Sequence, residues 1–430
     1  MPMAFASPAP LRDQIGSAFP ERPFRVRFWD GGELPATSAP VSGGEGPTFT
    51  VASPAAVAHA LRAPGQLGIG RAYVSGDLEV DDIDAVIELL DEWKPPPVDA
   101  ATKLRLMAAA IRAVGLRRPP SRPESELVPK GARHSRERDA RAVRHHYDVS
   151  NEFFDLFLDD SMTYSCGFFS FAREAADSDS LEAAQRAKLG LTADKLGIGE
   201  GDRVLDVGCG WGSFAITAAE RGAGEVLGVT LSEPQAERAR ERVEAAGCAD
   251  RVRIEVRDYR DLAGEGSFDA IGSIGMVEHV GAENIDLYAE TLAALLAPQG
   301  RLLNHGITRL RHTDPEAGPF SERYVFPDAD PVHLSRVLIA MERAGLLTRH
   351  VDEWGADYAE TLRHWARRLD DNLDRAIELA GEERVRVWRL YLRAARNGFE
   401  IGFTSIYQVL CTRPPSRGSA AEPVFGSVGS

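Results

Sequence analysis

Apolar positions in the second half of the chain form short runs that alternate with helical segments. From residue 203 onward these runs read RVLDVG, EVLGVT, VRIEV, FDAIGSI and RLLNHGI, and a final run near residue 405 reads SIYQVLC. Buried strands that alternate with helices predict an α/β fold with a doubly wound, mostly parallel sheet. Long helical stretches are expected at about 331–344 and 355–400, before the final strand.

The first part of the chain has a different pattern. Between about 24 and 93 it combines the alternating run FRVRFW, a glycine-rich turn, the run FTVAS and an amphipathic helix near AAVAHALRA, which predicts a smaller α+β domain. Farther on, HHYDVSNEFFDLFLDD and SLEAAQRAKLGLTADKL are expected to be helical and to lead into the sheet. We therefore expect an N-terminal domain over 1–115, a basic linker over 116–140, a second domain over 141–413 and a frayed tail over 414–430.

Composition narrows the class of protein. The 430 residues are 43% hydrophobic and 27% charged, typical of a globular protein, and no apolar run reaches the roughly 18 residues that a membrane span needs. The start of the chain shows no basic segment followed by an apolar one, so we expect no secretory signal and a cytoplasmic location. The four cysteines form no CxxC pair, which predicts reduced thiols and neither a disulfide framework nor a metal site.

Charge bears on the choice of partner. A net charge of −15 argues against nucleic-acid binding, and it would also repel an anionic membrane unless positive charge were concentrated locally. Such a concentration exists between Arg117 and Arg144, where nine Lys or Arg stand against four acids. This stretch is either a solvated linker or a contact for phospholipid headgroups.

The segment VLDVGCGWGSFAI places a glycine turn between a predicted strand and a predicted helix. Gly208, Gly210 and Gly212 allow backbone amides to approach a ligand closely, and the helix N-terminus favours negative charge. Asp206 precedes the turn, where an acid can bind an ammonium group, and the spacing is GxGxG instead of GxGxxG. The aminocarboxylate end of S-adenosylmethionine fits this arrangement better than a pyrophosphate. The alternative is a turn that serves strand-to-helix packing alone.

Polar residues follow the next two strands of the predicted sheet. After the second strand come Thr230, Leu231 and Gln235, uncharged residues at the place where many nucleotide sites offer an acid to the ribose. After the third strand, Asp258 can accept from an adenine amino group and Tyr259 can stack on the ring. Taken alone, these residues would also suit an ordinary loop.

Several segments together resemble the cyclopropane-fatty-acyl-phospholipid synthase family. They are HHYDVSNEFFDLFLDDSMTYSCGFF, VLDVGCGWGSF, VTLSEPQ, DYRDL, IGMVEHVG and RYVFP, and the resemblance covers about residues 140–411. It implies a class I, Rossmann-like methyltransferase fold with a seven-stranded sheet, and S-adenosylmethionine as methyl donor. The expected reaction is alkylation of the cis double bond of an unsaturated acyl chain.

The N-terminal region adds to this resemblance. The segment LGIGRAYVSGDLEV looks like part of the lipid-associated domain of the phospholipid-acting members, a domain that the mycolic acid methyltransferases lack. The resemblance therefore implies a membrane phospholipid as substrate and peripheral association with the inner face of the membrane. It also implies a homodimer.

The expected chemistry needs a dry, aromatic site. An isolated alkene is a poor nucleophile, so it must be aligned with the sulfonium methyl while water is kept from the resulting carbocation. Aromatic faces exclude water and stabilise a cation, although each such side chain would equally suit a plain core. The candidates are Phe153, Phe154, Phe157, Tyr164, Phe168 and Phe169.

A base must then remove a proton, and in the resembled family this base is a bound bicarbonate. The matching positions of this chain are Cys166, Glu278, His305, the Ile307 backbone and Tyr324. Thiol, imidazole, hydroxyl and amide groups can donate to an anion, and a glutamate can accept the proton of the anion. A covalent role for Cys166 is an alternative, but no basic partner adjoins it in the sequence.

The same matching predicts the residues that surround S-adenosylmethionine. His279 is interpreted as a structural or cofactor-side residue, and Gln408 as one that orients a ligand of the site. The predicted cofactor residues are Tyr147, Tyr164, Ser165, Gly208, Gly210, Thr230, Gln235, Asp258 and Tyr259, to which Asp206 and Leu231 are added from the turn and the second strand.

Two products and two other functions stay open at this point. The cation can close to a cyclopropane or lose a proton after a hydride shift to give a 10-methylene branch, which would need a separate reductase to become a 10-methyl acid. The bias of 45 Arg against 5 Lys is typical of GC-rich genomes, several of which make such acids. The alternatives are a small-molecule methyltransferase and a non-catalytic lipid-binding protein.

Overall fold

The computed structural model of the chain contains two compact units. The first consists of residues 1–130, 317–327 and 365–397, and the second of residues 131–316, 328–364 and 398–430. Most of the predicted basic linker and nearly all of the predicted tail lie outside the described part of the chain. The structure describes residues 7–41, 43–115, 120–127, 138, 149–170, 179–310, 319–326 and 329–415.

The first unit is built on a small mixed sheet, as the N-terminal pattern predicted. Its strand order is β2-β1-β3-β4, with β1 and β3 parallel and the other neighbours antiparallel. The strands are β1 (Arg25–Phe28), β2 (Glu33–Leu34), β3 (Thr48–Val51) and β4 (Leu78–Val80). The N-terminal helices are α1 (Ala9–Ala18), α2 (Pro54–Arg62), α3 (Gln66–Val74), α4 (Ile83–Glu92) and α5 (Ala100–Val114).

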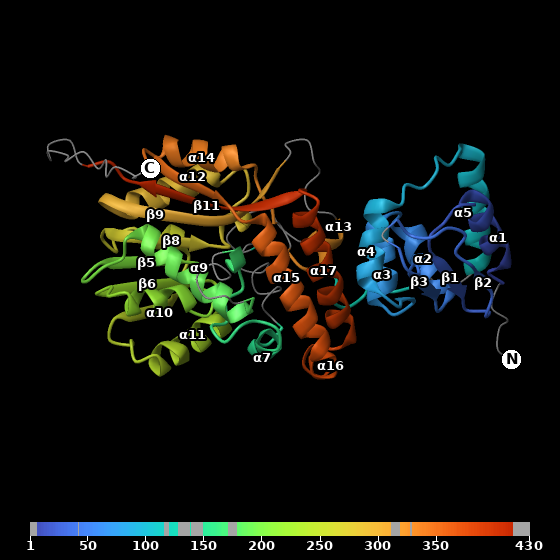
Figure 1. Ribbon diagram of the computed structural model, residues 1–430, viewed down its shortest axis with the longest axis horizontal. Coiled ribbons are helices and arrows are strands. Elements are labelled where there is room, and N and C mark those ends of the chain that lie inside the picture. Colours follow the sequence, from blue (N-terminus) through green and yellow to red (C-terminus); the bar gives the residue numbers. More distant parts are fainter. Residues whose placement is uncertain are drawn as a thin grey trace. The chain divides into compact units, whose positions relative to one another are not determined.

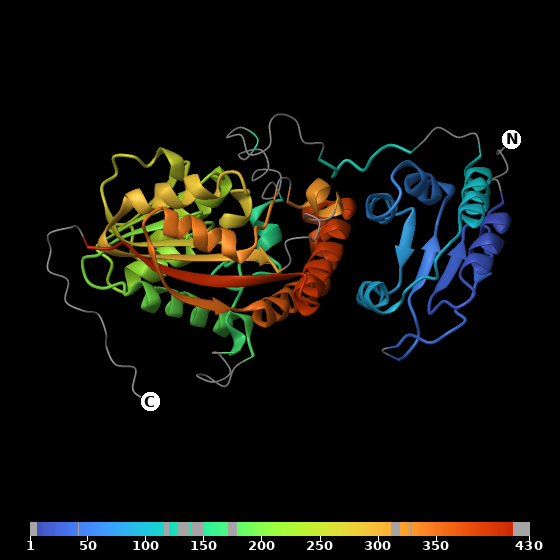
Figure 2. The same ribbon diagram turned by 90° about the horizontal axis from the view of Figure 1, so that it is seen from above.

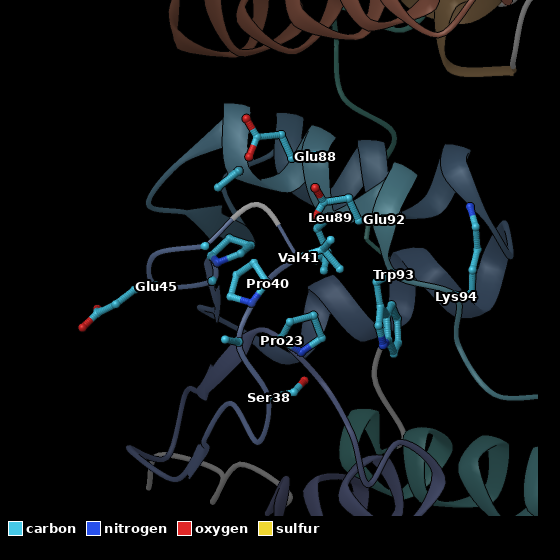
Figure 3. Close-up of a pocket in the computed structure, with 15 residues that line it drawn as sticks. Pro23, Ser38, Pro40, Val41, Glu45, Glu88, Leu89, Glu92, Trp93 and Lys94 are labelled. Atoms are coloured by element: carbon cyan, nitrogen blue, oxygen red, sulfur yellow. The ribbon is translucent and has the colours of Figure 1, made fainter.

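A cavity of about 170 Å³ lies in this unit between α4 and the loop that precedes β3. Pro23, Pro40, Leu89 and Trp93 give it apolar walls, and acidic side chains such as Glu88 stand at the same wall (Figure 3). Its lining contains none of the residues predicted from the sequence for the cofactor or the base.

Later pieces of the chain complete the first unit. The predicted helical stretch 355–400 is broken into three helices, and Gly381, at a φ of 78°, ends the second of them. Arg386 on the third helix donates to both carboxylate oxygens of Glu79, at 2.6 and 2.9 Å. These later elements are α13 (Pro319–Tyr324), the part of α15 (Gly355–Asp371) from Trp365 onward, α16 (Leu373–Ala380) and α17 (Glu382–Glu400) as far as Asn397.

The second unit contains a seven-stranded sheet of order β10-β11-β9-β8-β5-β6-β7. The five neighbours from β9 to β7 are parallel, whereas β11 is antiparallel to both of its neighbours. This confirms the predicted doubly wound, mostly parallel sheet. The strands are β5 (Arg203–Val207), β6 (Glu225–Thr230), β7 (Val252–Val256), β8 (Phe268–Ile274), β9 (Leu296–Arg309), β10 (Leu347–Glu353) and β11 (Thr404–Thr412).

Helices cover both faces of this sheet. Successive strand residues point to opposite faces, so Leu205 packs in the same cluster as Leu292 of α12 while Val204 packs in the cluster of Phe214 of α10. Figures 1 and 2 show α12 and α14 on one face and α9, α10 and α11 on the other. These helices are α9 (Leu181–Leu196), α10 (Ser213–Glu220), α11 (Glu233–Ala245), α12 (Ile285–Leu295) and α14 (Leu334–Arg343).

Two local predictions need correction. Strand β10 was not located from the sequence, because its residues are half-buried or exposed along the sheet edge and form no apolar run. In the predicted helix HHYDVSNEFFDLFLDD, the described residues form a short helix, α7 (Asn151–Asp155), followed by turns. Residues 145–148 of that segment lie outside the described part of the chain.

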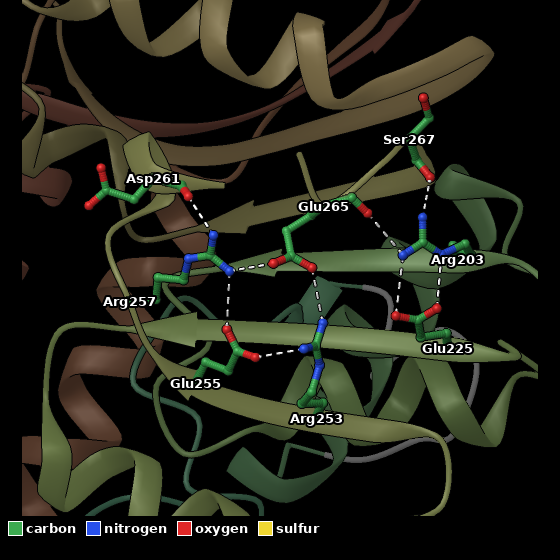
Figure 4. A network of polar contacts seen from close by, with 8 residues as sticks. All are labelled: Arg203, Glu225, Arg253, Glu255, Arg257, Asp261, Glu265 and Ser267. Carbon is green, nitrogen blue, oxygen red and sulfur yellow. Dashed lines mark hydrogen bonds and ion pairs between the residues drawn. The ribbon is translucent and has the colours of Figure 1, made fainter. Parts of the chain in front are cut away.

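The opposite edge strand, β7, buries Val252 and Ile254 in the core and alternates them with charged side chains. Arg253, Glu255 and Arg257 belong to a network of ion pairs that also includes Glu265 (Figure 4). Charged edge strands resist pairing with another chain. Exposed ion pairs add little to the free energy of folding, so the main effect of this network is to prevent such pairing. Among the described helices, none combines the length and the apolar character needed to cross a bilayer.

Candidate active site

The predicted cofactor residues gather where parallel strands end. The chain runs from β5 to β6 and β7 on one side and to β8 and β9 on the other, so the strand order reverses at β5. Ligands of doubly wound sheets bind outside the carboxyl ends of the strands at such a reversal. Asp206, Thr230 and Asp258 lie at or directly after the ends of β5, β6 and β7.

The glycine turn after β5 has a backbone that favours glycine. Gly208, Gly210 and Gly212 have φ values of 78°, 52° and 83°. A Cβ atom on Gly208 would lie 2.9 Å from Cγ of Met276, so a larger residue would also crowd the neighbouring segment. The amides of Gly208 and Cys209 both donate to the carbonyl of Val229 at 2.9 Å, which ties the turn to β6.

Asp206 is a buried carboxylate with one unsatisfied oxygen. Burial raises its pKa to about 7, although a backbone hydrogen bond from Ala215 and the charge of Lys188 act in the opposite direction. Its Oδ2 atom has no hydrogen-bond partner in the described structure. Buried polar atoms are nearly always paired, so this oxygen is suited to a cationic group brought by a ligand.

The residues after β6 and β7 are held by local hydrogen bonds. Thr230 donates its hydroxyl to Oε1 of Gln235 at 2.9 Å, and both side chains are buried. Asp258 accepts from the Arg260 guanidinium at 2.6 Å, so part of its acceptor capacity is used within the chain. The Tyr259 ring packs edge-on against Tyr288, with ring centroids 5.7 Å apart.

Glu278 is the centre of the predicted base site. It lies on the short helix η2 (Val277–His279), and its Oε1 atom accepts from the Ile307 amide at 2.7 Å. Burial raises its pKa to about 7, and backbone hydrogen bonds oppose this shift. Its Oε2 atom has no partner in the described structure.

His305 lies two residues before Ile307 on β9 and is fully buried. Both of its ring nitrogens lack a hydrogen-bond partner among the described residues. Burial, together with the charges of Lys188 and Lys195, holds its pKa well below the ordinary value. The imidazole is therefore neutral, with one N–H donor and one acceptor.

Cys166 is buried beside the same group of residues. Its thiol donates to the Gly167 carbonyl at 3.1 Å and lies 3.8 Å from the carbonyl of Trp354, whose ring contacts His305 edge-on at 5.1 Å. Burial raises the pKa of Cys166 well above its ordinary value. A protonated thiol is a donor and a poor nucleophile, so the covalent alternative loses support.

The structure does not assign two of the predicted residues to this arrangement. Tyr324 belongs to the first unit, where its hydroxyl donates to Glu126 at 3.1 Å, so its role as a base ligand stays a prediction. Tyr147 lies outside the described residues. Of the other predictions, Gln408 is the cross-strand neighbour of His305 and accepts from Lys195 at 2.6 Å.

The predicted aromatic residues form two groups. Phe154 contacts Trp211 of the glycine turn at 5.0 Å and Tyr164 at 5.6 Å, in a cluster that also contains Phe153 and Phe157. Phe168 stacks on Trp354 with ring centroids 4.2 Å apart, and the Trp354 ring also contacts His305 of the predicted base site. Phe169 stacks on His364 at 5.1 Å.

The sequence interpretation missed a buried lysine. Lys188 on α9 is fully buried and donates to the Ser165 hydroxyl at 2.8 Å. Burial lowers its pKa to about 8, and the charges of Asp159, Cys166 and Asp206 oppose this shift. A signal was available, because Gln185, Lys188 and Thr192 recur at helical spacing on the buried face of α9. Trp354 was also missed.

Comparison with known proteins settles the family. The family model described as mycolic acid cyclopropane synthetase matches residues 134–409. The chain belongs to this family. It is 36% identical to a probable fatty acid methyltransferase of Pseudomonas putida, over 92% of this chain and 93% of that protein. It is 32% identical to the cyclopropane-fatty-acyl-phospholipid synthase of Escherichia coli strain K12, over 82% of this chain and 85% of that protein.

Solved structures agree with this assignment. A crystal structure of a mycolic acid cyclopropane synthase complexed with SAH and CTAB is 32% identical, with a TM-score of 0.59 over 64% of this chain and 98% of that one. The resemblance found in the sequence is thus confirmed. The second unit has a class I methyltransferase fold, and the chain is an S-adenosylmethionine-dependent methyltransferase that acts in fatty-acid modification.

Proposed function

We propose that this enzyme transfers a methyl group from S-adenosylmethionine to the cis double bond of an unsaturated phospholipid acyl chain. The sulfonium loses its methyl to one alkene carbon, which leaves S-adenosylhomocysteine and a carbocation on the other carbon. Loss of a proton from the new methyl group then closes a cyclopropane. Loss of that proton after a hydride shift gives a methylene branch instead, and a separate reductase would convert that branch into a methyl group.

The observation that carries this proposal is the group of unsatisfied polar atoms around β9. Glu278 Oε2 and both ring nitrogens of His305 are buried without partners, and the buried Cys166 thiol lies near Trp354, whose ring contacts His305. Such atoms fit a small, hydrogen-bonding anion, and bicarbonate suits this mixture of donors and one acceptor. When bound, bicarbonate would supply the base that takes the proton.

The residues of the chain would each hold or orient a group. The His305 N–H donates toward the anion, and the Cys166 thiol would donate to it by turning from the Gly167 carbonyl. Glu278 accepts the proton of the anion because a pKa of about 7 keeps this carboxyl poised between its two forms. The Ile307 amide fixes Glu278 at 2.7 Å. Tyr324 is proposed as a further donor, which requires its hydroxyl to leave Glu126.

The cofactor would bind at the carboxyl ends of β5, β6 and β7. The free oxygen of Asp206 would receive the ammonium group of S-adenosylmethionine, and Gly208 and Gly210 would let the backbone approach its methionine end. Asp258 and Tyr259 would contact the adenine. The remaining proposed contacts are Tyr147, Tyr164, Ser165, Thr230, Leu231 and Gln235.

The proposed partner and location follow from the proposed substrate. A phospholipid acyl chain requires the enzyme to work at a membrane, so we place it at the cytoplasmic face as a peripheral protein. The similarity to an enzyme named for a fatty-acyl-phospholipid product supports this choice over a small-molecule substrate. A homodimer is also proposed.

The test is to express the chain in cells fed an unsaturated fatty acid and methionine with a trideuterated methyl group. The expected lipids gain one labelled carbon that has lost one deuterium, because the base removes a proton from the transferred methyl. Gas chromatography with mass spectrometry then separates the cyclopropane from the methylene product. Unlabelled acyl chains, from a purified enzyme that still binds S-adenosylmethionine, would contradict the proposal.

A further inference from the structure

Helix α5 of the first unit buries three alanines and exposes three large apolar residues, while Leu106 and Val114 are half-buried. Ala109, Ala110 and Ala113 are buried in a cluster with Leu11 of α1. On the other side, Leu104, Met107 and Ile111 are exposed. This arrangement is the reverse of that of an ordinary surface helix, whose large apolar residues face the core.

The exposed residues form one continuous stripe. Leu104, Met107 and Ile111 stand three and four positions apart, so they share one face of the helix. Their exposed fractions are 70%, 53% and 56%. An apolar stripe of this length in contact with water is unfavourable unless a partner covers it.

The charges that flank this stripe indicate the partner. Lys103 lies on one side of it, and Arg105 and Arg112 lie on the other, whereas the helix contains no acid. Asp99, which precedes the helix, is used as its N-cap and accepts from the Thr102 amide at 2.6 Å. Three cations without an acid are notable in a chain of net charge −15.

We propose that α5 is the element by which this enzyme docks on a bilayer of anionic phospholipid. An amphipathic helix with basic flanks lies in the plane of the membrane interface, with its apolar face among the acyl chains and its cations at the headgroups. Leu104, Met107 and Ile111 enter the acyl region, while Lys103, Arg105 and Arg112 contact the phosphates. The inference rests on the proposed function in naming phospholipid as the partner.

The alanine face explains why the stripe can stay exposed without loss of the fold. Leu11, Ala109, Ala110 and Ala113 hold α5 against the rest of the unit, so the outer residues are not needed for packing. Replacing them should leave the urea midpoint of unfolding close to that of the parent, as is usual at exposed positions. Binding and folding can therefore be measured separately.

The test uses the full chain and sedimented vesicles of phosphatidylglycerol mixed with phosphatidylcholine. A triple variant, L104Q with M107Q and I111Q, should bind about a hundredfold more weakly, because each partly inserted side chain contributes about fivefold. Its matched control is L90Q, which changes a leucine of α4 that is 68% exposed and lies outside the stripe. The control should bind like the parent.

Charge is tested in the same assay. The variants K103Q, R105Q and R112Q should each weaken binding to the anionic vesicles about fivefold, and they should not affect binding to vesicles of phosphatidylcholine alone. Binding of the parent should weaken as salt is raised.

Turnover separates this inference from the proposed function. The triple variant should methylate vesicle lipids poorly but should match the parent on an unsaturated phospholipid dispersed in detergent. If the triple variant binds vesicles as the parent does, or if its main change is dissociation of a dimer in solution, α5 is not the docking element. If the parent binds vesicles through α5 but methylates no lipid in either form, the proposed function fails and the docking role stands.

Discussion

Two buried glutamates, one in each unit, have pKa values shifted in opposite directions. Glu126 in the first unit accepts two hydrogen bonds from Arg71 at 2.7 Å and one from Tyr324 at 3.1 Å. Burial raises its pKa, but the hydrogen bonds and charge of Arg71 outweigh burial and leave the pKa below the ordinary value. No cation offsets the burial of Glu278 in the second unit. Burial therefore raises its pKa to about 7.

The difference distinguishes buried carboxyl groups that are paired within the chain from those that can still bind a ligand or exchange a proton. Glu126 has its partners within the chain, so it stays ionised and helps to hold its unit together. Glu278 keeps one oxygen unsatisfied and titrates near neutral pH, and Asp206 does the same beside the glycine turn. Carboxyl groups left in this state are typical of binding and catalytic sites.

The largest expected effect is on turnover. Glu278→Gln should lower the rate of lipid methylation about a thousandfold, because an amide cannot accept the proton that the base must pass on. The rate should be measured by transfer of labelled methyl to phospholipid, with S-adenosylmethionine affinity followed by calorimetry. Glu225→Gln, at an exposed ion pair with Arg203, is the control and should stay within about twofold of the parent. A Glu278→Gln enzyme as active as the parent would rule out the proposed base site.

The second effect is on stability in the first unit. Glu126→Gln should lower the free energy of unfolding by about 3 kcal/mol, because it leaves the buried Arg71 without an ionic partner. Urea denaturation at pH 7.5 would measure it. The double variant with Arg71→Met should recover part of the loss, since no buried charge then remains unpaired. Two equal losses that simply add would show that the pair is not coupled.

The third effect has the opposite sign to that of Glu126→Gln. Glu278→Gln should stabilise the protein at alkaline pH. The folded pKa of about 7 lies above the ordinary 4.5, so the stability due to this carboxyl is complete below pH 4.5 and is lost as pH rises through 7. At pH 8 the variant should therefore be more stable than the parent by about 2 kcal/mol. At pH 5 the two should differ little. A variant that is less stable at pH 8 would contradict the raised pKa.

The smallest effect concerns the cofactor. If the ionised Asp206 binds the ammonium group of S-adenosylmethionine, affinity should fall below pH 7, by up to about tenfold per pH unit. Calorimetry between pH 5.5 and 8.5 would show it, and Asp206→Asn should bind weakly at every pH. Lys188→Met should move the midpoint to higher pH, because the charge of Lys188 lowers the pKa of Asp206. An unmoved midpoint would show that Lys188 does not act on this carboxyl.

Some features of the fold could be read directly from local patterns. Apolar runs located six of the seven strands, and the glycine spacing predicted a turn after β5, where the structure has left-handed backbone at Gly208 and Gly210. Strand β10 was missed because an edge strand with half-exposed residues has no apolar run. The break at Gly381 was missed because the helical periodicity continues on both sides of it.

The sequence alone determined the family, the class of sheet and the residue types available for the chemistry, because motif spacing and hydrophobic periodicity are local properties of the chain. It could not determine acidity. The pKa of Glu278 depends on burial and on the amide of Ile307, which is 29 positions away along the chain, and that of Glu126 depends on Arg71, 55 positions away. Only the tertiary structure brings such groups together, and it alone buried Lys188 beside Ser165 and left the stripe of α5 exposed to water.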